Sequence, residues 1–234
     1  MSVPKENINA CLYIVPTPIG NLDDITIRAV KILNEVDIIA CEDTRTTGNL
    51  LFLLKIKPKK LVSYHNYNEQ EKASHFIEEI LIGKSVALLS DAGTPAISDP
   101  GYTLVKEAIN NNIKIVPLPG ATALIPALNA SGLPTNNFTF LGFPPQKKGR
   151  KSFLEHALNF STTTILYESS HRIEKLINEL IGLGYADRQI SVSRELTKLF
   201  EEHIRGTIAE VQKILNKTQI KGEFVVVIEG KKAK

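Results

Sequence analysis

The stretch LSDAGTPAISDPG at residues 89–101 decides the fold class. An apolar run at residues 85–89 predicts a buried strand before it, and helical spacing continues after it to about residue 110. Asp99 followed by Pro100 is typical of a helix N-cap and first helical position. The connecting loop is longer than a plain connector requires, and its small residues let main-chain groups face a ligand. We therefore expect a ligand-binding loop between a buried strand and a helix.

The same alternation of strand and helix continues through the first half of the chain. Strand-like runs stand at residues 12–15, 37–41, 60–64, 85–89 and 113–116. Helical spacing stands at residues 25–36, 44–54 and 68–82, with Asp24 as an expected N-cap and Asn68 and Glu71 as an expected capping box. Continuously apolar strands that alternate with helices predict an α/β domain with a mostly parallel sheet over residues 1–117.

The segment PLPG at residues 117–120 interrupts this pattern, and we expect the domain boundary after residue 117. Expected strands in residues 118–234 are 138–141, 163–167, 189–192, 200–205 and 224–229. Expected helices are 121–130, 151–159, 171–183 and 208–215. The higher share of strands predicts a second α/β domain with a mixed sheet.

Composition places the chain among ordinary globular proteins. Of its 234 residues, 43% are hydrophobic and 23% are charged. Since no apolar run reaches the roughly 18 residues of a membrane span, and the first residues lack a signal-peptide core, we expect a cytoplasmic protein without a membrane partner. Cys11 and Cys41 each adjoin an apolar run, which favours buried free thiols over a disulfide or a metal site.

The net charge of +3 is divided unevenly between the two halves. Residues 1–117 contain 12 Lys and Arg against 14 Asp and Glu, a net charge of −2, whereas residues 118–234 contain 16 against 11, a net charge of +5. This asymmetry is a weak indication that the second half faces a polyanion. The basic loop at residues 147–151 is the densest run, although a solvated loop explains it equally well.

Several predicted strands are followed by polar segments. The first is PTPIGN at residues 16–21, in which two prolines and Gly20 suit either a turn or a close approach to a ligand. YHNYNE at residues 64–69 combines aromatic rings with polar groups, as in nucleobase stacking sites. A lone histidine in a loop, such as His65, is more often only solvated than a catalytic base.

Two carboxylates and an arginine follow the second predicted strand. They are Glu42, Asp43 and Arg45. Asp43 as a helix cap and Arg45 in a surface pair would be an ordinary explanation, but it leaves Glu42 without a role. Further polar clusters at residues 167–172, 194–198 and 221–223 also adjoin strand ends. A surface ion pair explains any one of these charges, whereas all three clusters together favour a binding surface.

These segments, in this order, resemble the tetrapyrrole methylase fold family of S-adenosylmethionine-dependent methyltransferases. Within it they are most similar to the ribosomal RNA small-subunit methyltransferase I type. The resemblance runs from about residue 12 to residue 230. The motifs that carry it are LYIVPTPIGNLDDIT (12–26), EDTR (42–45), HNYNEQ (65–70), LSDAGTPAISDPGY (89–102), VPLPGATA (116–123), FLGFPP (140–145), LYESSHR (166–172), RELTK (194–198) and KGEFVVVIEG (221–230).

The resemblance implies two α/β domains with S-adenosylmethionine in the cleft between them, and a homodimer. Metal-ligand spacings such as Cys-x-x-Cys or His-Glu-x-x-His are absent from the sequence, so we expect no metal. It implies methylation of the ribose 2′-hydroxyl of a cytidine in the decoding region of 16S ribosomal RNA, within the small ribosomal subunit. The implied cofactor-binding residues are Pro18, Asp91, Gly93, Thr94, Ile97, Ala121, Thr122, Ala123, Tyr167 and Glu168. The implied substrate-side residues are Asp43, Arg45, His65 and Asn66.

Two departures bear on these expectations. The first loop reads PTPIGN at residues 16–21 rather than the glycine-rich pattern of the tetrapyrrole branch, which counts against a tetrapyrrole substrate. Many members of the ribosomal branch extend in helices beyond the last strand, whereas this sequence ends at Lys234.

Methylation of a ribose hydroxyl requires removal of its proton. The candidate bases are Asp43, Glu42 and His65, with Arg45 binding a phosphate or polarising the hydroxyl. An RNA substrate also requires phosphate contacts. The candidates for these are Lys147, Lys148, Arg150, Arg194, Lys198 and Lys221. Two other functions stay open: the same cofactor acting on a tetrapyrrole or other small molecule, and a non-catalytic ribosome-assembly factor.

Overall fold

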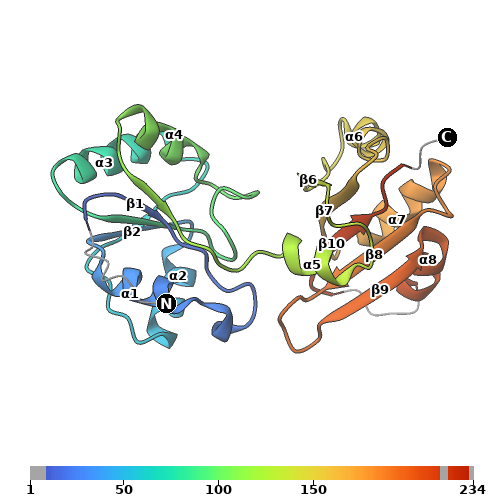
Figure 1. The fold of residues 1–234 in the computed structure, drawn as a ribbon, viewed down its shortest axis with the longest axis horizontal. Helices are drawn as coiled ribbons and strands as arrows, with labels where there is room; N and C mark the ends of the chain where they lie inside the picture. The colour runs from blue at the N-terminus through green and yellow to red at the C-terminus, as the bar shows by residue number, and fades with distance from the viewer. Residues whose placement is uncertain (1–8, 217–220, 232–234) are drawn as a thin grey trace. The chain divides into compact units, whose positions relative to one another are not determined.

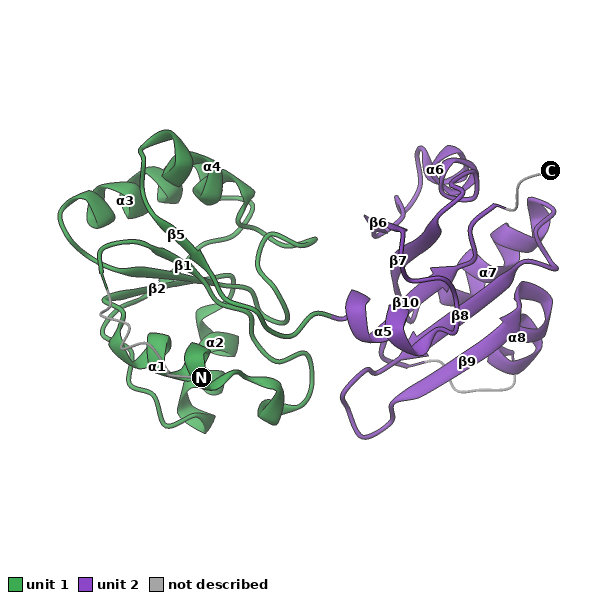
Figure 2. Ribbon diagram, viewed as in Figure 1, with its two compact units in different colours: residues 1–122 green, residues 123–234 purple. Residues whose placement is uncertain are grey.

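The computed structural model describes residues 9–216 and 221–231, and the chain divides into two compact units (Figure 2). Unit 1 comprises residues 1–122 and unit 2 residues 123–234. Unit 1 extends a few residues past the predicted boundary after residue 117, because Leu118 is buried in its core and Ala121 O accepts a hydrogen bond from Thr94 Oγ1 at 2.9 Å.

Unit 1 is built on a parallel sheet. Its strands are β1 (Leu12–Ile14), β2 (Ile38–Cys41), β3 (Leu61–Ser63), β4 (Val86–Leu89) and β5 (Ile115–Pro117). They lie in the order β3-β2-β4-β1-β5, and each neighbouring pair is parallel. The predicted parallel sheet is therefore confirmed, and the carboxyl ends of all these strands meet at one edge.

Helices cover both faces of this sheet (Figure 1). They are the short η1 (Leu22–Asp24), α1 (Ile27–Glu35), α2 (Thr44–Leu53), α3 (Glu69–Leu81) and α4 (Tyr102–Asn110). One core cluster joins Tyr13 and Ile39 to Ile32 of α1, and another joins the intervening strand residues to Phe76 of α3 and Leu104 of α4. Since successive strand residues point to opposite faces, burial on both sides explains the continuously apolar strands.

Two predicted helix starts are wrong. Thr26 caps α1, with its side chain accepting a hydrogen bond from Ala29 N at 3.0 Å, whereas Asp24 lies in η1. Helix α4 begins at Tyr102, so Asp99 belongs to the preceding loop and does not cap it. In both places a later residue begins the helix.

Unit 2 contains a mixed sheet, as predicted. Its strands are β6 (Phe138–Gly142), β7 (Thr163–Ser169), β8 (Gln189–Arg194), β9 (Glu202–Thr207) and β10 (Glu223–Ile228), in the order β6-β7-β10-β8-β9. Strands β6 and β7 pair in parallel, and the other neighbours are antiparallel.

One helix-covered core supports this second sheet. Its helices are α5 (Leu124–Ala130), α6 (Arg150–Ala157), α7 (Ile173–Gly182) and α8 (Ile208–Leu215). Leu154 of α6, Leu176 of α7 and Val211 of α8 share a buried cluster with Val192 and Val226 of the sheet. Helix α5 packs against β8 and β10.

Two expectations on chain chemistry can be compared with the structure. Cys11 and Cys41 are buried free thiols, as predicted. Over residues 9–216 and 221–231, no helix combines the length and apolarity that crossing a membrane requires.

Candidate active site

The predicted site loops of unit 1 meet at the carboxyl edge of its sheet. Strands β3 and β2, which are neighbours, lead into residues 64–68 and 42–45, the predicted substrate side. Strands β4, β1 and β5, also neighbours, lead into residues 90–101, 16–21 and 118–122, the predicted cofactor side. Open α/β sheets bind ligands at this edge. The order of the strands thus separates the two predicted groups of residues into adjacent halves of one edge.

The three loops on the cofactor side are joined by hydrogen bonds. Thr17 and Gly93 exchange two main-chain hydrogen bonds of 2.9 Å each. Thr17 Oγ1 donates to Ser90 O at 3.2 Å, and Thr94 Oγ1 donates to Ala121 O at 2.9 Å. The predicted residues Gly93, Thr94 and Ala121 therefore lie together, with Pro18 directly after Thr17.

Backbone shape explains the small residues of these loops. A Cβ atom on Gly120 would lie 2.5 Å from Pro16 Cβ, so only glycine lets the chain after β5 approach the chain after β1 so closely. Ala96 and Ser98 both have a backbone φ of 66°, in the left-handed region that residues other than glycine rarely adopt. The predicted Ile97 is exposed between them. The loop therefore holds an unusual shape that presents an apolar side chain at its surface.

Asp43 serves as a helix cap and as an ion-pair partner. Its Oδ1 accepts a hydrogen bond from Arg45 N at 2.8 Å, and its Oδ2 lies 2.6 Å from Arg45 Nη2. These hydrogen bonds lower the pKa of Asp43 to about 2. A carboxylate held so firmly in its charged form is a weak base. The Arg45 side chain is 90% exposed, so its outer face is open to an anion.

A cluster of carboxylates stands between the two halves of the edge. Asp91 Oδ1 accepts a hydrogen bond from Asp43 N at 3.0 Å, across the neighbouring strands β4 and β2. Burial and the charge of Asp91 raise the pKa of Glu42. Burial and the charges of Glu42 and Asp91 raise the pKa of Asp99 to about 6. The cluster thus contains carboxyl groups that can accept a proton closer to neutral pH than ordinary ones.

Asp99 is a site residue that the sequence analysis missed. Asp99 followed by Pro100 is typical of a helix start, and this local pattern gives no sign that the Asp99 carboxyl interacts electrostatically with Glu42 and Asp91. The remaining signal was its membership of the long loop after β4. In the described part of the chain, no group of His, Cys, Asp and Glu is arranged to hold a metal ion.

The third loop, residues 64–68 between β3 and α3, is ordered by its own side chains. Asn68 Oδ1 accepts a hydrogen bond from His65 N at 2.8 Å, so the predicted capping box of Asn68 with Glu71 is wrong. Asn68 Nδ2 donates to Ser63 O at 3.3 Å and lies 3.4 Å from His65 Nε2. His65 Nδ1 is buried and has no hydrogen-bond partner among the described residues. His65 Nδ1 is therefore closed to a substrate in this conformation and Nε2 lies against Asn68, whereas the neighbouring Asn66 is exposed.

In unit 2, Glu168 and Arg150 form a buried ion network. Glu168 accepts hydrogen bonds from Arg150 Nη2 at 3.0 Å, Arg172 Nε at 2.7 Å and Ser169 N at 2.9 Å. Arg150 Nε also donates to Glu179 Oε2 at 2.7 Å. The side chains of Glu168 and Arg150 are 0% and 3% exposed. Both residues were predicted to touch ligands, but burial and mutual pairing occupy their charged groups.

Tyr167, the residue before Glu168, lies in an aromatic cluster. Its ring meets the edges of Phe140 and Phe143, with ring centroids 4.9 and 5.4 Å away. Phe143 remains 52% exposed. The cluster offers part of an aromatic surface at the end of β7, and the sequence analysis had not singled out Phe143.

The predicted phosphate-binding residues fall into two groups. Lys147 and Lys148 are exposed in the loop before α6, and Lys221 is also exposed. Arg194 Nε donates to the main-chain oxygen of Lys221 at 2.8 Å, and Lys198 Nζ lies 3.0 Å from carboxylates of both Glu195 and Glu223. Arg194 and Lys198 therefore already join the ends of β8 and β10.

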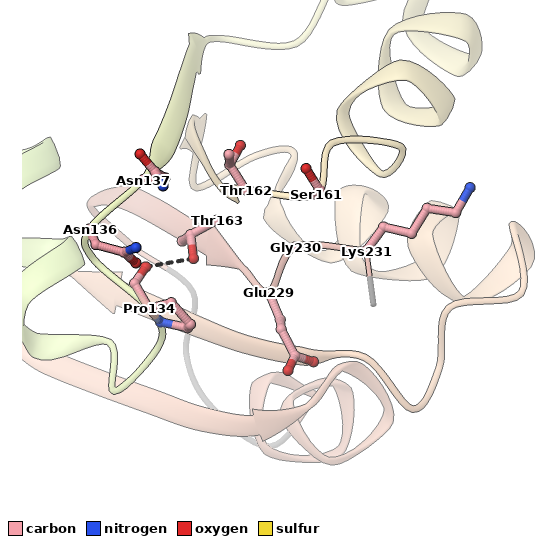
Figure 3. Close-up of a pocket in the computed structure, with 9 residues that line it drawn as sticks. All are labelled: Pro134, Asn136, Asn137, Ser161, Thr162, Thr163, Glu229, Gly230 and Lys231. Atoms are coloured by element: carbon pink, nitrogen blue, oxygen red, sulfur yellow. Dashed lines mark hydrogen bonds between the residues drawn. The ribbon is translucent and has the colours of Figure 1, made fainter. Parts of the chain in front are cut away.

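A hollow of about 350 Å³ lies elsewhere in unit 2 (Figure 3). Its lining residues are Pro134, Asn136, Asn137, Ser161, Thr162, Thr163, Glu229, Gly230 and Lys231. It adjoins Thr163 at the start of β7, whereas Tyr167 and Glu168 stand near the end of that strand. None of the predicted site residues lines it.

Comparison with known proteins identifies the family. The sequence profile described as Tetrapyrrole (Corrin/Porphyrin) Methylases matches residues 11–212. The chain is 48% identical, over 98% of its length and 79% of the relative, to a Halalkalibacterium halodurans protein named Ribosomal RNA small subunit methyltransferase I.

Solved structures share the fold at low sequence identity. The methyltransferase CobJ has a TM-score of 0.67 and 18% identity, over 96% of this chain and 97% of that one. Uroporphyrin-III C-methyltransferase from Thermus thermophilus, solved with S-adenyl homocysteine, has a TM-score of 0.62 and 16% identity, over 94% and 97%. The parallel sheet, the loops at its edge and the sequence match agree, and the chain belongs to the tetrapyrrole (corrin/porphyrin) methylase family.

Proposed function

We propose that this chain transfers a methyl group from S-adenosylmethionine to the ribose 2′-hydroxyl of a cytidine in the decoding region of 16S ribosomal RNA. The 48% identity to a protein named Ribosomal RNA small subunit methyltransferase I, over 98% of the chain, carries the proposal. The solved uroporphyrin-III C-methyltransferase, whose name gives a tetrapyrrole substrate, shares only 16% sequence identity with this chain. The first loop, PTPIGN at residues 16–21, agrees with an RNA substrate.

The loops on the cofactor side suit S-adenosylmethionine. This molecule carries positive charge on its sulfonium and its ammonium group, and the carboxylates of Asp91 and Asp99 concentrate negative charge on the cofactor side of the edge. Gly93 and the left-handed turn around Ile97 offer main-chain groups and one apolar side chain to the uncharged part of the cofactor. When bound, the cofactor supplies a methyl group that is reactive toward an in-line nucleophile. Its expected position between the two domains stays a prediction.

Glu42 is the base that this geometry favours. Its raised pKa makes it a better proton acceptor than Asp43, whose pKa lies at about 2. His65 has one ring nitrogen against Asn68 and the other buried. A positioned base contributes roughly a hundredfold or more to proton removal in the transition state. Arg45, exposed beside Asp43, binds a phosphate of the same nucleotide.

The RNA contacts of unit 2 come from its exposed lysines. Residues 118–234 carry 16 Lys and Arg against 11 Asp and Glu, and Lys147, Lys148 and Lys221 are exposed. Neutralised phosphates supply most of the sequence-independent affinity for a nucleic acid. The small ribosomal subunit as substrate, a homodimer and a cytoplasmic location stay predictions.

Transfer of a labelled methyl group in vitro tests this function. The purified protein is incubated with labelled S-adenosylmethionine and either small ribosomal subunits that lack the modification or a mixture of tetrapyrrole precursors. We expect label only in the ribosomal RNA. Label only in a tetrapyrrole would favour the small-molecule alternative, and ribosome binding without cofactor binding would favour an assembly factor.

A further inference from the structure

One carboxylate at the start of α3 closes the N-terminus of α4. Glu69 Oε1 accepts hydrogen bonds from Gly101 N at 3.2 Å and Thr103 N at 3.1 Å. Tyr64 Oη donates to the same oxygen at 2.9 Å and accepts from Leu104 N at 3.2 Å. Two side chains that stand far from α4 in the sequence thus satisfy the first main-chain donors of this helix.

Helix α4 cannot supply such a cap by itself. Gly101, the residue before its first turn, has a φ of 147°, and a Cβ atom there would lie 3.1 Å from Ala96 Cβ and Leu88 Cδ2. A serine, threonine or aspartate cap is therefore excluded at this position by space and by backbone conformation. The N–H groups of a first helical turn have no partners within the helix, so the cap must come from elsewhere.

The charge of the pair suits this place. Although partial burial disfavours its charge, the hydrogen bonds from Tyr64 and from the main chain of Thr103 and Gly101 lower the pKa of Glu69. Burial and the adjacent Glu69 raise the pKa of Tyr64. A carboxylate and a neutral phenol are thus present at neutral pH. Glu69 is also the first residue of α3, so its negative charge lies at the N-termini of two helices, where such a charge is favourable.

The pair also sets the far end of the cofactor loop. The near end of this loop is held by the bridge between Thr17 and Gly93, and its far end at Gly101 is held by Glu69. Asp99 lies just before this far end. Tyr64 and Glu69 in turn enclose the third loop, which contains His65 and Asn66.

We propose that Glu69 and Tyr64 are positioning residues that hold residues 90–101 in the shape that binds the cofactor and couple this loop to the substrate-side loop. The proposal rests on the proposed function, because it assumes that residues 90–101 bind S-adenosylmethionine. It predicts that the pair controls cofactor affinity although neither side chain contacts the cofactor.

Four variants test whether Glu69 and Tyr64 act together as a clamp, that is, whether they hold residues 90–101 in the cofactor-binding shape. They are Glu69→Ala, Glu69→Gln, Tyr64→Phe and the control Glu71→Ala, which removes an exposed carboxylate from the same first turn of α3. Binding of S-adenosylhomocysteine is measured by calorimetry, and exchange of the amide hydrogens of Gly101, Thr103 and Leu104 by mass spectrometry or NMR. We expect Glu69→Ala to weaken binding by roughly tenfold, as for loss of a hydrogen bond to a charged group, with Glu69→Gln and Tyr64→Phe weakened less. The amide hydrogens at the start of α4 should exchange faster in each of these three variants. Their exchange rates should be unchanged in Glu71→Ala.

The outcomes distinguish a failure of the clamp from a failure of the proposed methyltransferase function. Binding by the wild type with unchanged affinity in Glu69→Ala and Tyr64→Phe would overturn the clamp, even if their unfolding midpoints fall, because the pair would then be only a helix cap. If Glu69→Ala does not fold, the milder Tyr64→Phe and Glu69→Gln decide by the same comparison. No binding by the wild type would contradict the proposed function, and the clamp with it.

Discussion

The main-chain N–H of Asp43 donates to Asp91 Oδ1 at 3.0 Å and joins the ends of the neighbouring strands β2 and β4. Strand β2 leads into the proposed substrate side, and β4 leads into the proposed cofactor loop. One carboxylate therefore fixes the position of one half of the edge against the other. Methyl transfer depends on such placement, since alignment of the reacting groups can contribute several kcal/mol to lowering the barrier.

Replacement of Asp91 should weaken cofactor binding. Asp91→Ala removes both the acceptor for Asp43 N and a negative charge of the cluster, and we expect at least a roughly tenfold loss of affinity for S-adenosylmethionine. Asp91→Asn keeps an acceptor oxygen and should lose less. Calorimetry measures both, with Asp23→Asn as a control at an exposed carboxylate near the same edge. An unchanged affinity in Asp91→Ala would remove this residue from the cofactor side.

Glu42→Gln should abolish most of the turnover while leaving the cofactor bound. A glutamine cannot accept the proton, so we expect kcat to fall roughly a hundredfold or more with little change in cofactor affinity. Because burial and Asp91 raise the pKa of Glu42, the acid limb of the wild-type profile of kcat against pH should lie above the range of an ordinary glutamate. Glu78→Gln on the exposed side of α3 is the control. Full activity in Glu42→Gln would reassign the base.

Asp99 makes the stability of unit 1 depend on pH. Its pKa is raised to about 6 in the folded state, so ionisation of this carboxyl opposes folding. Its stabilising contribution is complete below about pH 4, the unfolded pKa, and is lost as the pH rises through about 6, a change of about 3 kcal/mol. Denaturant titrations across this range should therefore show a smaller decline for Asp99→Asn than for the wild type. Parallel curves for the two proteins would contradict the raised pKa.

The ion network of unit 2 should stabilise the fold and should not contact a ligand. Glu168→Gln removes the carboxylate that pairs with both the buried Arg150 and the partly buried Arg172, so Arg150 keeps only Glu179 as a charged partner. We expect a loss of about 3 kcal/mol in the free energy of unfolding. Glu174→Gln on the exposed face of α7 should change little. Cofactor affinity, measured well below the unfolding transition, should stay near that of the wild type. Lost affinity with intact stability would return Glu168 to the cofactor site.

The basic loop before α6 should contribute to RNA affinity. The double variant Lys147→Glu and Lys148→Glu should weaken binding of the small ribosomal subunit, and its dependence on salt should be shallower by about 1 per lost phosphate contact. The exposed Lys213→Glu on α8 serves as the control for a general change of charge. Equal affinities and equal salt slopes in all three proteins would show that this loop is only solvated.

The fold was largely predictable because most of its strands are apolar runs that are buried on both faces. Each expected strand and helix is present, and the parallel and mixed sheets occur in the expected halves. Helix starts were less predictable. The local pattern at Asp99 and Pro100 is typical of a cap, but α4 takes its cap from Glu69 and Tyr64, and no local pattern reports a contact over more than thirty residues.

The site was predictable where a residue's position along a strand decides its place. Asp43, Asp91 and Gly93 follow strand ends and therefore reach one edge. Arg150 and Glu168 could not be placed in this way. Charged residues are mostly exposed, and only the fold shows that these two bury and pair with each other.

We propose that this chain methylates a ribose in the decoding region of 16S ribosomal RNA. Mass mapping of ribosomal RNA from cells with and without the gene tests this proposal most directly. We expect one cytidine in that region to carry a 2′-O-methyl group when the gene is present and to lack it when the gene is deleted. Retention of every ribose methyl group after deletion, or loss of a methyl group from a base instead, would contradict it.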